Sequence, residues 1–194
     1  MSEMKSAWEK ALEKAEKLGG LSEEEIKQFE YVPVGNRLAS RYLCEAEFNL
    51  DAELTKYRGT GVRKYVVQGA EEILVRNIML PQNDRDRQAA ARAMAGLRLL
   101  KENKSQLELV LDRITNLINY YEQARQQTYL QFKKDFEAKL QQANRVARQQ
   151  GARVYTEPES HPQFLDQWRQ ISSQLNAQYE KALEEHRQLI LKIA

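Results

Sequence analysis

The chain has 194 residues, of which 42% are hydrophobic and 30% are charged, a balance too apolar for a disordered chain and too polar for a membrane protein. Its 30 basic and 28 acidic residues leave a net charge of +2, whereas a dedicated nucleic-acid binder usually carries a much larger basic excess. Only 8 glycines and 4 prolines interrupt the sequence, so long helices are expected and the predicted fold class is all-α.

The first predicted helix covers about residues 2–18, where apolar residues recur every three or four positions. Gly19 and Gly20 end it, because glycine readily adopts the left-handed conformation found at helix ends. Ser22 and Glu25 have the spacing of a capping box, in which each side chain bonds to the backbone N–H of the other residue. A second helix is therefore predicted to begin immediately after Ser22.

This second helix is expected to be short and to end near Glu30. Pro33 disfavours helical angles in the residue before it, which predicts an extended connection over residues 31–36. A third helix is predicted over residues 36–57 and a fourth over residues 62–79. The middle of the fourth is rich enough in β-branched and aromatic residues to form a strand, but the spacing of its apolar residues favours a helix.

A fifth helix is predicted after Asn83, which has the side chain of a helix cap. Small residues fill its middle, residues 89–96, so another backbone can approach it closely. Residues 101–104 are polar, and Ser105 and Glu108 then have the spacing of another capping box. The sequence therefore predicts a break between this helix and the next.

The next predicted helix is the longest and covers about residues 105–150, with no proline or glycine inside it. Its apolar residues keep helical spacing, apart from one step of eight residues near the middle. They are Leu107, Leu111, Ile114, Ile118, Tyr121, Tyr129, Phe132, Phe136, Leu140, Ala143 and Ala147. After a loop of about ten residues, a last helix over residues 161–194 carries a matching stripe. Two helices joined in this way are expected to lie antiparallel.

The expected organisation is a helical bundle followed by a long hairpin. Residues 1–104 form an N-terminal globular region of about five helices. Residues 105–194 form a long antiparallel, coiled-coil-like hairpin made of residues 105–150 and 161–194. The sequence leaves open whether this hairpin packs onto the first region as one domain.

Aromatic residues are concentrated where the two long helices are expected to meet. They are Tyr121, Tyr129, Phe132, Phe136, Phe164 and Trp168, which together form the candidate interaction surface. Two helices alone cannot bury whole aromatic stripes from both members, so the excess needs the N-terminal helices, another copy of the chain or a different protein. A protein partner or self-association follows, with a dimer favoured.

Two groups of basic residues are considered as binding sites for anionic ligands. Arg145, Arg148 and Arg153 form a candidate basic patch near the hairpin tip, which could hold a nucleic-acid backbone, although a solvated helical surface explains it more simply. Residues 58–64 carry two glycines and basic side chains before a helix, a weak pattern for anion binding that a helix-to-helix turn also explains. Nucleic-acid association is therefore the alternative function.

No pattern of catalysis or metal binding is found. His161 and His186 lack a glutamate three positions before them, and Cys44 has no histidine near it in sequence. The longest apolar runs, such as residues 78–80, are far too short to span a membrane, and the N-terminus lacks a signal-peptide core. We therefore expect a non-enzymatic cytoplasmic interaction or scaffold protein without cofactors or membrane contact.

Overall fold

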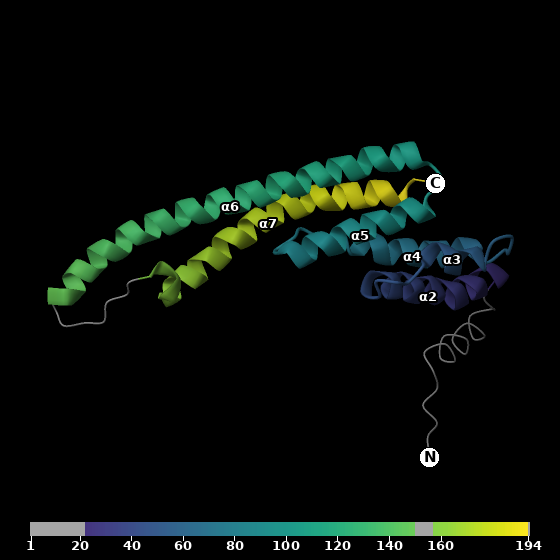
Figure 1. The fold of residues 1–194 in the computed structure, drawn as a ribbon, viewed down its shortest axis with the longest axis horizontal. Helices are drawn as coiled ribbons and strands as arrows, with labels where there is room; N and C mark the ends of the chain where they lie inside the picture. The colour runs from purple at the N-terminus through teal and green to yellow at the C-terminus, as the bar shows by residue number, and fades with distance from the viewer. Residues whose placement is uncertain (1–21, 150–156, 194) are drawn as a thin grey trace, which may run out of the picture.

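The computed structural model describes residues 22–149 and 157–193, and the predicted helix over residues 2–18 lies outside them. Within these ranges the protein is entirely helical, which confirms the all-α prediction. The elements are α2 (Glu23–Cys44), α3 (Leu50–Thr55), α4 (Arg63–Arg76), α5 (Asp84–Leu100), α6 (Lys104–Gln149), a short 3₁₀ helix η1 (Pro158–Ser160) and α7 (Pro162–Leu191). Helices α2 to α5 gather at one end, while α6 and α7 lie side by side and extend beyond them (Figure 1).

Helix α2 begins as predicted but continues much further. The hydroxyl of Ser22 accepts a hydrogen bond from the N–H of Glu25, whose carboxylate accepts one from the N–H of Ser22. The predicted end near Glu30 and the extended segment over residues 31–36 are wrong, because α2 runs through Pro33 to Cys44. Pro33 is exposed, so water can reach the carbonyl that it leaves unbonded, and burial of the following turns offsets the cost of the proline.

The helix predicted over residues 36–57 is wrong as a single element. It is divided by a turn over residues 45–49, after which the side chain of Asn49 caps α3 by accepting a hydrogen bond from the Ala52 N–H at 3.0 Å. The turn allows Leu50 and Leu54 to enter the core, where both are buried.

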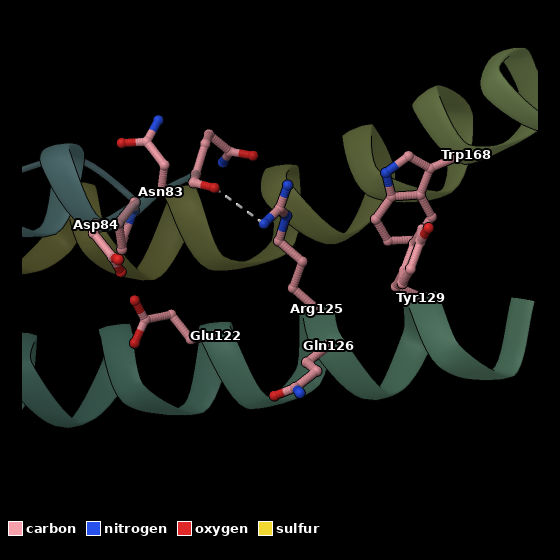
Figure 2. A pocket seen from close by; sticks show the side chains of 9 residues that line it. Asn83, Asp84, Glu122, Arg125, Gln126, Tyr129 and Trp168 are labelled. Atoms are coloured by element: carbon pink, nitrogen blue, oxygen red, sulfur yellow. Dashed lines mark hydrogen bonds between the residues drawn. The ribbon is translucent and has the colours of Figure 1, made fainter. Parts of the chain in front are cut away.

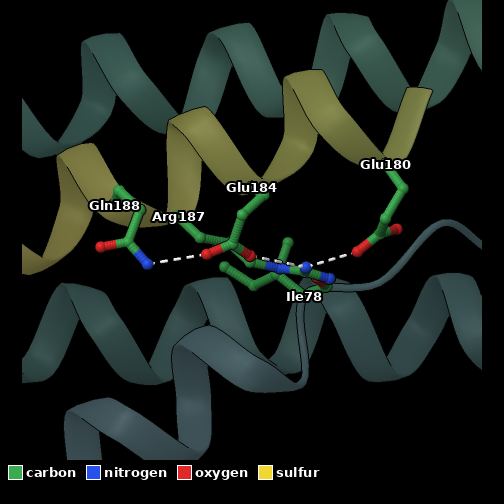
Figure 3. A network of polar contacts seen from close by, with 5 residues as sticks. All are labelled: Ile78, Glu180, Glu184, Arg187 and Gln188. Carbon is green, nitrogen blue, oxygen red and sulfur yellow. Dashed lines mark hydrogen bonds and ion pairs between the residues drawn. The ribbon is translucent and has the colours of Figure 1, made fainter. Parts of the chain in front are cut away.

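The fourth helix also ends earlier than expected, at Arg76, and the chain leaves it at Asn77. The side chain of Asn77 caps this end by donating to the carbonyl of Ile73 at 2.8 Å, and Arg187 of α7 holds the next segment, where its Nε donates to the carbonyl of Ile78 at 2.8 Å (Figure 3). The same guanidinium is held by Glu180 at 2.5 Å and by Glu184 at 3.2 Å. A residue of α7 thus holds the segment that follows α4.

The break between α5 and α6 is found where the sequence places it, but a different residue caps α6. Asn83 caps α5 as predicted, accepting a hydrogen bond from the Asp86 N–H at 3.0 Å. At α6 the cap is Asn103, whose Oδ1 accepts from the N–H of Gln106 at 3.1 Å, so the predicted capping box at Ser105 is wrong. The helix consequently starts one residue earlier, at Lys104.

Helices α2 and α4 touch backbone to backbone at two glycines. A Cβ atom built on Gly35 would lie 1.9 Å from the carbonyl oxygen of Val66, and one built on Gly69 would lie 2.1 Å from that of Val32. Such distances are far below any van der Waals contact, so only glycine fits at either position. The two helices therefore pack more closely than side chains at these positions would allow.

One large hydrophobic core joins the bundle to the long helices. It contains residues of α2 to α5, the α6 residues from Leu107 to Tyr121, and Leu183, Ile190 and Ile193 near the end of the chain. A second, smaller core lies further along α6 and α7, around Phe136 and Phe164. We call the part that contains the smaller core the arm, and define it as residues 126–149 and 157–174.

A buried ion pair fixes the corner between α5 and α6. The side chain of Lys101 is only 5% exposed, and its ammonium lies 2.5 Å from the carboxylate of Glu71 on α4. The same ammonium donates to the carbonyl of Ile193, beyond the end of α7. Burial raises the pKa of Glu71 above its ordinary value, although the ammonium beside it acts in the opposite direction.

The facing rings show how α6 and α7 are aligned. Tyr121 contacts Tyr179 at a centroid distance of 5.4 Å, and Tyr129 contacts Trp168 at 5.0 Å. As the residue number rises along α6, that of its partner on α7 falls, so the two helices run in opposite directions through this stretch.

Candidate functional site

A cavity of about 420 Å³ lies where the arm leaves the bundle, between the start of α5, the middle of α6 and α7 (Figure 2). Its walls include Asn83, Asp84, Glu122, Arg125, Gln126, Tyr129 and Trp168. Figure 2 shows the acidic side chains at one end, Arg125 in the middle, and the two aromatic rings at the other end. The cavity thus combines both charges with an apolar wall.

The acidic end of the cavity is held in place by α5. Arg87 binds the carboxylate of Glu122 at 2.5 Å through Nη1 and donates to Oδ1 of Asn119 at 2.9 Å through Nη2. Asp84 occupies the first position of α5, where the positive end of the helix dipole stabilises a carboxylate. Arg87 therefore fixes the position of Glu122, and the start of α5 stabilises the charge of Asp84.

Arg125 is less completely bonded than Arg87. Its Nη1 donates to the carbonyl of Gln82 at 3.3 Å, a long hydrogen bond. Its Nε is buried and has no hydrogen-bond partner in the protein. A guanidinium has five N–H donors in a planar fork, so most of the binding capacity of Arg125 is unused.

Tyr121 of the candidate interaction surface lies apart from the other five residues. It is fully buried in the large core, and its hydroxyl accepts from Nε2 of Gln82 at 2.6 Å and donates to Oδ1 of Asn176 at 2.8 Å. This bonding is what a buried tyrosine requires. Tyr121 therefore connects the segment before α5 to α6 and α7.

The other five candidate residues form one aromatic cluster inside the arm. Its closest ring pairs are Phe132 with Phe164 at 4.7 Å, Tyr129 with Trp168 at 5.0 Å, and Phe136 with Phe164 at 5.2 Å. Phe164 and Phe136 are buried, whereas Tyr129, Phe132 and Trp168 are partly exposed. The cluster packs the two helices of the arm against each other, and only its partly exposed members can meet another molecule.

A polar contact fastens η1 to α6 beside this cluster. Glu159 accepts a hydrogen bond from the Tyr129 hydroxyl at 3.1 Å and pairs with the Lys133 ammonium at 2.5 Å. Lys133 accordingly holds the pKa of Glu159 below its ordinary value. Burial is the main reason that the pKa of Tyr129 is raised. The chain leading into α7 is thus positioned by α6.

The outside of the arm carries exposed apolar side chains. Leu130 on α6 is 57% exposed and Leu165 on α7 is 49% exposed. Each directly follows a residue of the aromatic cluster, Tyr129 or Phe164. Because residues on a helix are rotated by about 100° from one to the next, and the two helices run in opposite directions, both leucines turn towards the same side of the arm.

Of the candidate basic patch, only Arg145 has a described side chain, and it is exposed on the outer part of α6. The side chain of Arg148 and the whole of Arg153 lie outside the described residues. Residues 58–64, the weak pattern for anion binding, include Gly59, which adopts a φ of 78° in the turn before α4, and Lys64, which lies in the first turn of α4 and pairs with Glu24 of α2 at 3.0 Å.

The remaining chemistry-bearing residues are scattered. Cys44 is a free, exposed thiol, and His186 is half-buried. Across residues 22–149 and 157–193, no three histidine, cysteine, aspartate or glutamate side chains gather as a metal site would require. None of the helices described is long and apolar enough to cross a bilayer.

The cavity was missed from the sequence, although a signal for it exists. The apolar stripe of α6 has an eight-residue step between Tyr121 and Tyr129, and the polar residues Glu122, Arg125 and Gln126 in that step line the cavity. A polar interval on an otherwise buried face thus marks the place where α6 leaves the bundle core and passes the cavity.

No curated protein and no solved structure matches the chain. A protein family does match, over residues 51–192, which include nearly all of α3, the whole of α4 to α7, the cavity, the arm and most of the large core. Helix α2 precedes the matched residues. The protein belongs to this family, a family of unknown function designated DUF6657.

Proposed function

We propose that the protein is a non-enzymatic helical interaction or scaffold protein of the cytoplasm, and that it contacts its partner through the arm. In this proposal α6 and α7 act as a long antiparallel, coiled-coil-like hairpin. The observation that supports it is the division of α6 between two cores, since the bundle core reaches only to Tyr121 while the helix continues to Gln149.

The length of the arm supports a role in reaching a partner. At about 1.5 Å per residue, the helix beyond Tyr121 adds on the order of 40 Å that the bundle core does not use. A two-helix element buries little apolar surface relative to its total surface, so it contributes little to the stability of a fold. A surface for binding is the simplest reason to build it.

A second copy of the chain is the partner that we propose. Leu130 and Leu165 lie on one side of the arm, and two such sides can pack together around a two-fold axis. Exposed charges of both signs, such as Lys134 and Asp135, follow the same stretch of α6, and the net charge of the chain is only +2. Two copies can therefore approach without strong repulsion.

Light scattering coupled to size-exclusion chromatography tests this proposal. We expect a mass twice that of the 22.7 kDa chain, and a shift to the single-chain mass in Leu130→Glu and Leu165→Glu. Leu109→Glu is the matched control, because Leu109 is 62% exposed on α6 outside the arm. A single-chain mass for the unmodified protein, or a dimer that both arm variants leave intact, would refute self-association through the arm.

The same measurement separates the nucleic-acid alternative. The ultraviolet absorbance ratio across the peak reports nucleic acid that is bound to the purified protein. Binding that salt removes, and that Arg145→Gln weakens, would favour the alternative over the scaffold proposal.

A further inference from the structure

The cavity at the root of the arm has no part in the proposed function, and its walls combine three kinds of group. Its volume of about 420 Å³ falls within the usual range for sites that bind small molecules. The arrangement in Figure 2 is ordered, with carboxylates at one end, a guanidinium in the middle and aromatic rings at the other end. A ligand of matching chemistry must carry complementary groups in the same order.

The guanidinium of Arg125 is suited to bind a carboxylate group of a ligand. Its Nε is buried without a partner, and its only hydrogen bond to the segment before α5 is the long one to Gln82, at 3.3 Å. The donors that a ligand in the cavity would meet are therefore the terminal nitrogens, Nη1 with its one long bond and Nη2, which no described residue binds. The planar fork of a guanidinium fits the two oxygens of a carboxylate.

The carboxylates of Asp84 and Glu122 favour a positively charged group on the ligand, next to the carboxylate that Arg125 binds. Their side chains face each other at the end of the cavity next to Arg125 (Figure 2). Arg87 neutralises one side of Glu122, at 2.5 Å, and fixes its position. Because Arg87 already balances the charge of Glu122, Asp84 is the carboxylate of the cavity wall whose charge is left to attract a ligand ammonium group.

The rings of Trp168 and Tyr129 favour an aromatic or apolar group of the ligand at the other end of the cavity. Their rings contact each other at a centroid distance of 5.0 Å, and both are partly exposed. A ring placed against them gains an aromatic contact in addition to burial of apolar area. Phe132 packs against Trp168 at a centroid distance of 6.0 Å, and Phe164 packs against Tyr129 at 6.2 Å, so this wall is preformed.

We propose that this cavity binds a free amino acid with an aromatic side chain. The ligand carboxylate would bind Arg125, its ammonium would lie between Asp84 and Glu122, and its ring would lie against Trp168 and Tyr129. Ligand binding at this inner cavity does not depend on dimerisation through the outer leucines, so the two proposals can fail separately.

Isothermal titration of the full chain with L-phenylalanine, L-tyrosine and L-tryptophan tests the proposal. We expect at least one of the three to bind, and Arg125→Gln to weaken that binding by about tenfold or more, the effect of losing a charged hydrogen bond. Arg113→Gln, an exposed arginine of α6 away from the cavity, is the matched control and should bind like the unmodified protein. Circular dichroism confirms that both variants fold.

Two analogues distinguish a free amino acid from the end of a peptide. N-acetyl-L-phenylalanine lacks the ammonium group and L-phenylalaninamide lacks the carboxylate, so both should bind at least tenfold more weakly than L-phenylalanine. Equal binding of either analogue would assign the cavity to a peptide end and overturn the proposal. It would also be overturned if none of the three amino acids binds, or if Arg125→Gln binds as tightly as the unmodified protein.

Discussion

Replacing Gly35 by alanine is expected to push α2 and α4 apart and so to lower the stability of the protein. The new Cβ would lie 1.9 Å from the carbonyl oxygen of Val66, whereas real Cβ contacts stay beyond 3.0 Å, so the helices must move apart by about 1 Å. Neither atom can turn away, because both belong to helix backbone or are fixed to it. Buried neighbours in the seam, Ala39 and Ala70, would lose contact together.

The magnitude follows from two opposing effects. Alanine is favoured over glycine within a helix by about 1 kcal/mol. Overpacking a tight contact costs about 1–3 kcal/mol, and the rigid backbone at this site places the cost at the upper end. We expect Gly35→Ala to lower the free energy of unfolding by about 2 kcal/mol, and Gly69→Ala to do the same, since its Cβ would lie 2.1 Å from the Val32 carbonyl oxygen.

Urea denaturation followed by circular dichroism measures these changes, and two other glycines give a graded comparison. A Cβ on Gly96 would meet side-chain atoms of Leu74 and Tyr42 at 2.9 Å, which can rotate, so its alanine variant should lose less. Gly61 has nothing within 4 Å, so Gly61→Ala should change stability by less than about 0.5 kcal/mol. If Gly35→Ala is as stable as Gly61→Ala, the close contact between α2 and α4 does not exist.

Three further substitutions test other parts of the fold. Lys101→Met should destabilise the protein by about 3 kcal/mol at neutral pH, because it leaves the buried carboxylate of Glu71 without its partner. This deficit should shrink in acid, because the Lys101 ammonium lowers the pKa of the buried Glu71 in the unmodified protein and its loss raises that pKa further. Glu71 of the variant therefore takes up a proton at higher pH than Glu71 of the unmodified protein, so the stability difference between the two proteins grows as the pH rises through this range. Phe164→Ala should lower the stability of the arm by about 3 kcal/mol and leave that of the bundle unchanged, because Phe164 belongs to the smaller core. Hydrogen exchange measured by mass spectrometry should then show lost protection in the arm alone. Tyr121→Phe should cost about 1–2 kcal/mol in urea denaturation, because Asn176 loses its buried partner.

Each of these three predictions would be contradicted by a specific result. A Lys101→Met deficit that stays constant with pH would show that Glu71 is not the group left unpaired. Loss of protection throughout the bundle in Phe164→Ala would mean that the two cores unfold as one. Unchanged stability in Tyr121→Phe would show that its hydroxyl is not a structural bond.

Local signals in the sequence were sufficient for most helix boundaries. The capping box at Ser22, the cap at Asn83 and the proline in the first turn of α7, Pro162, act through contacts within about four residues. The stripe of α6 likewise depends only on the helical period, and it predicted a continuous helix of more than forty residues, as found. Interactions of such short range can be read without knowing the rest of the fold.

The tertiary structure decided what those signals could not. Whether Pro33 ends a helix depends on the burial that α4 provides, and the segment after α4 is held by Arg187, more than a hundred residues further along the chain. The cavity needs Asp84, Arg125 and Trp168 from three helices, and their juxtaposition follows from the way in which the bundle, α6 and α7 pack. The period of a sequence specifies which face of a helix is apolar, but the partner that covers that face, and the polar groups brought together beside it, are set only when distant segments meet.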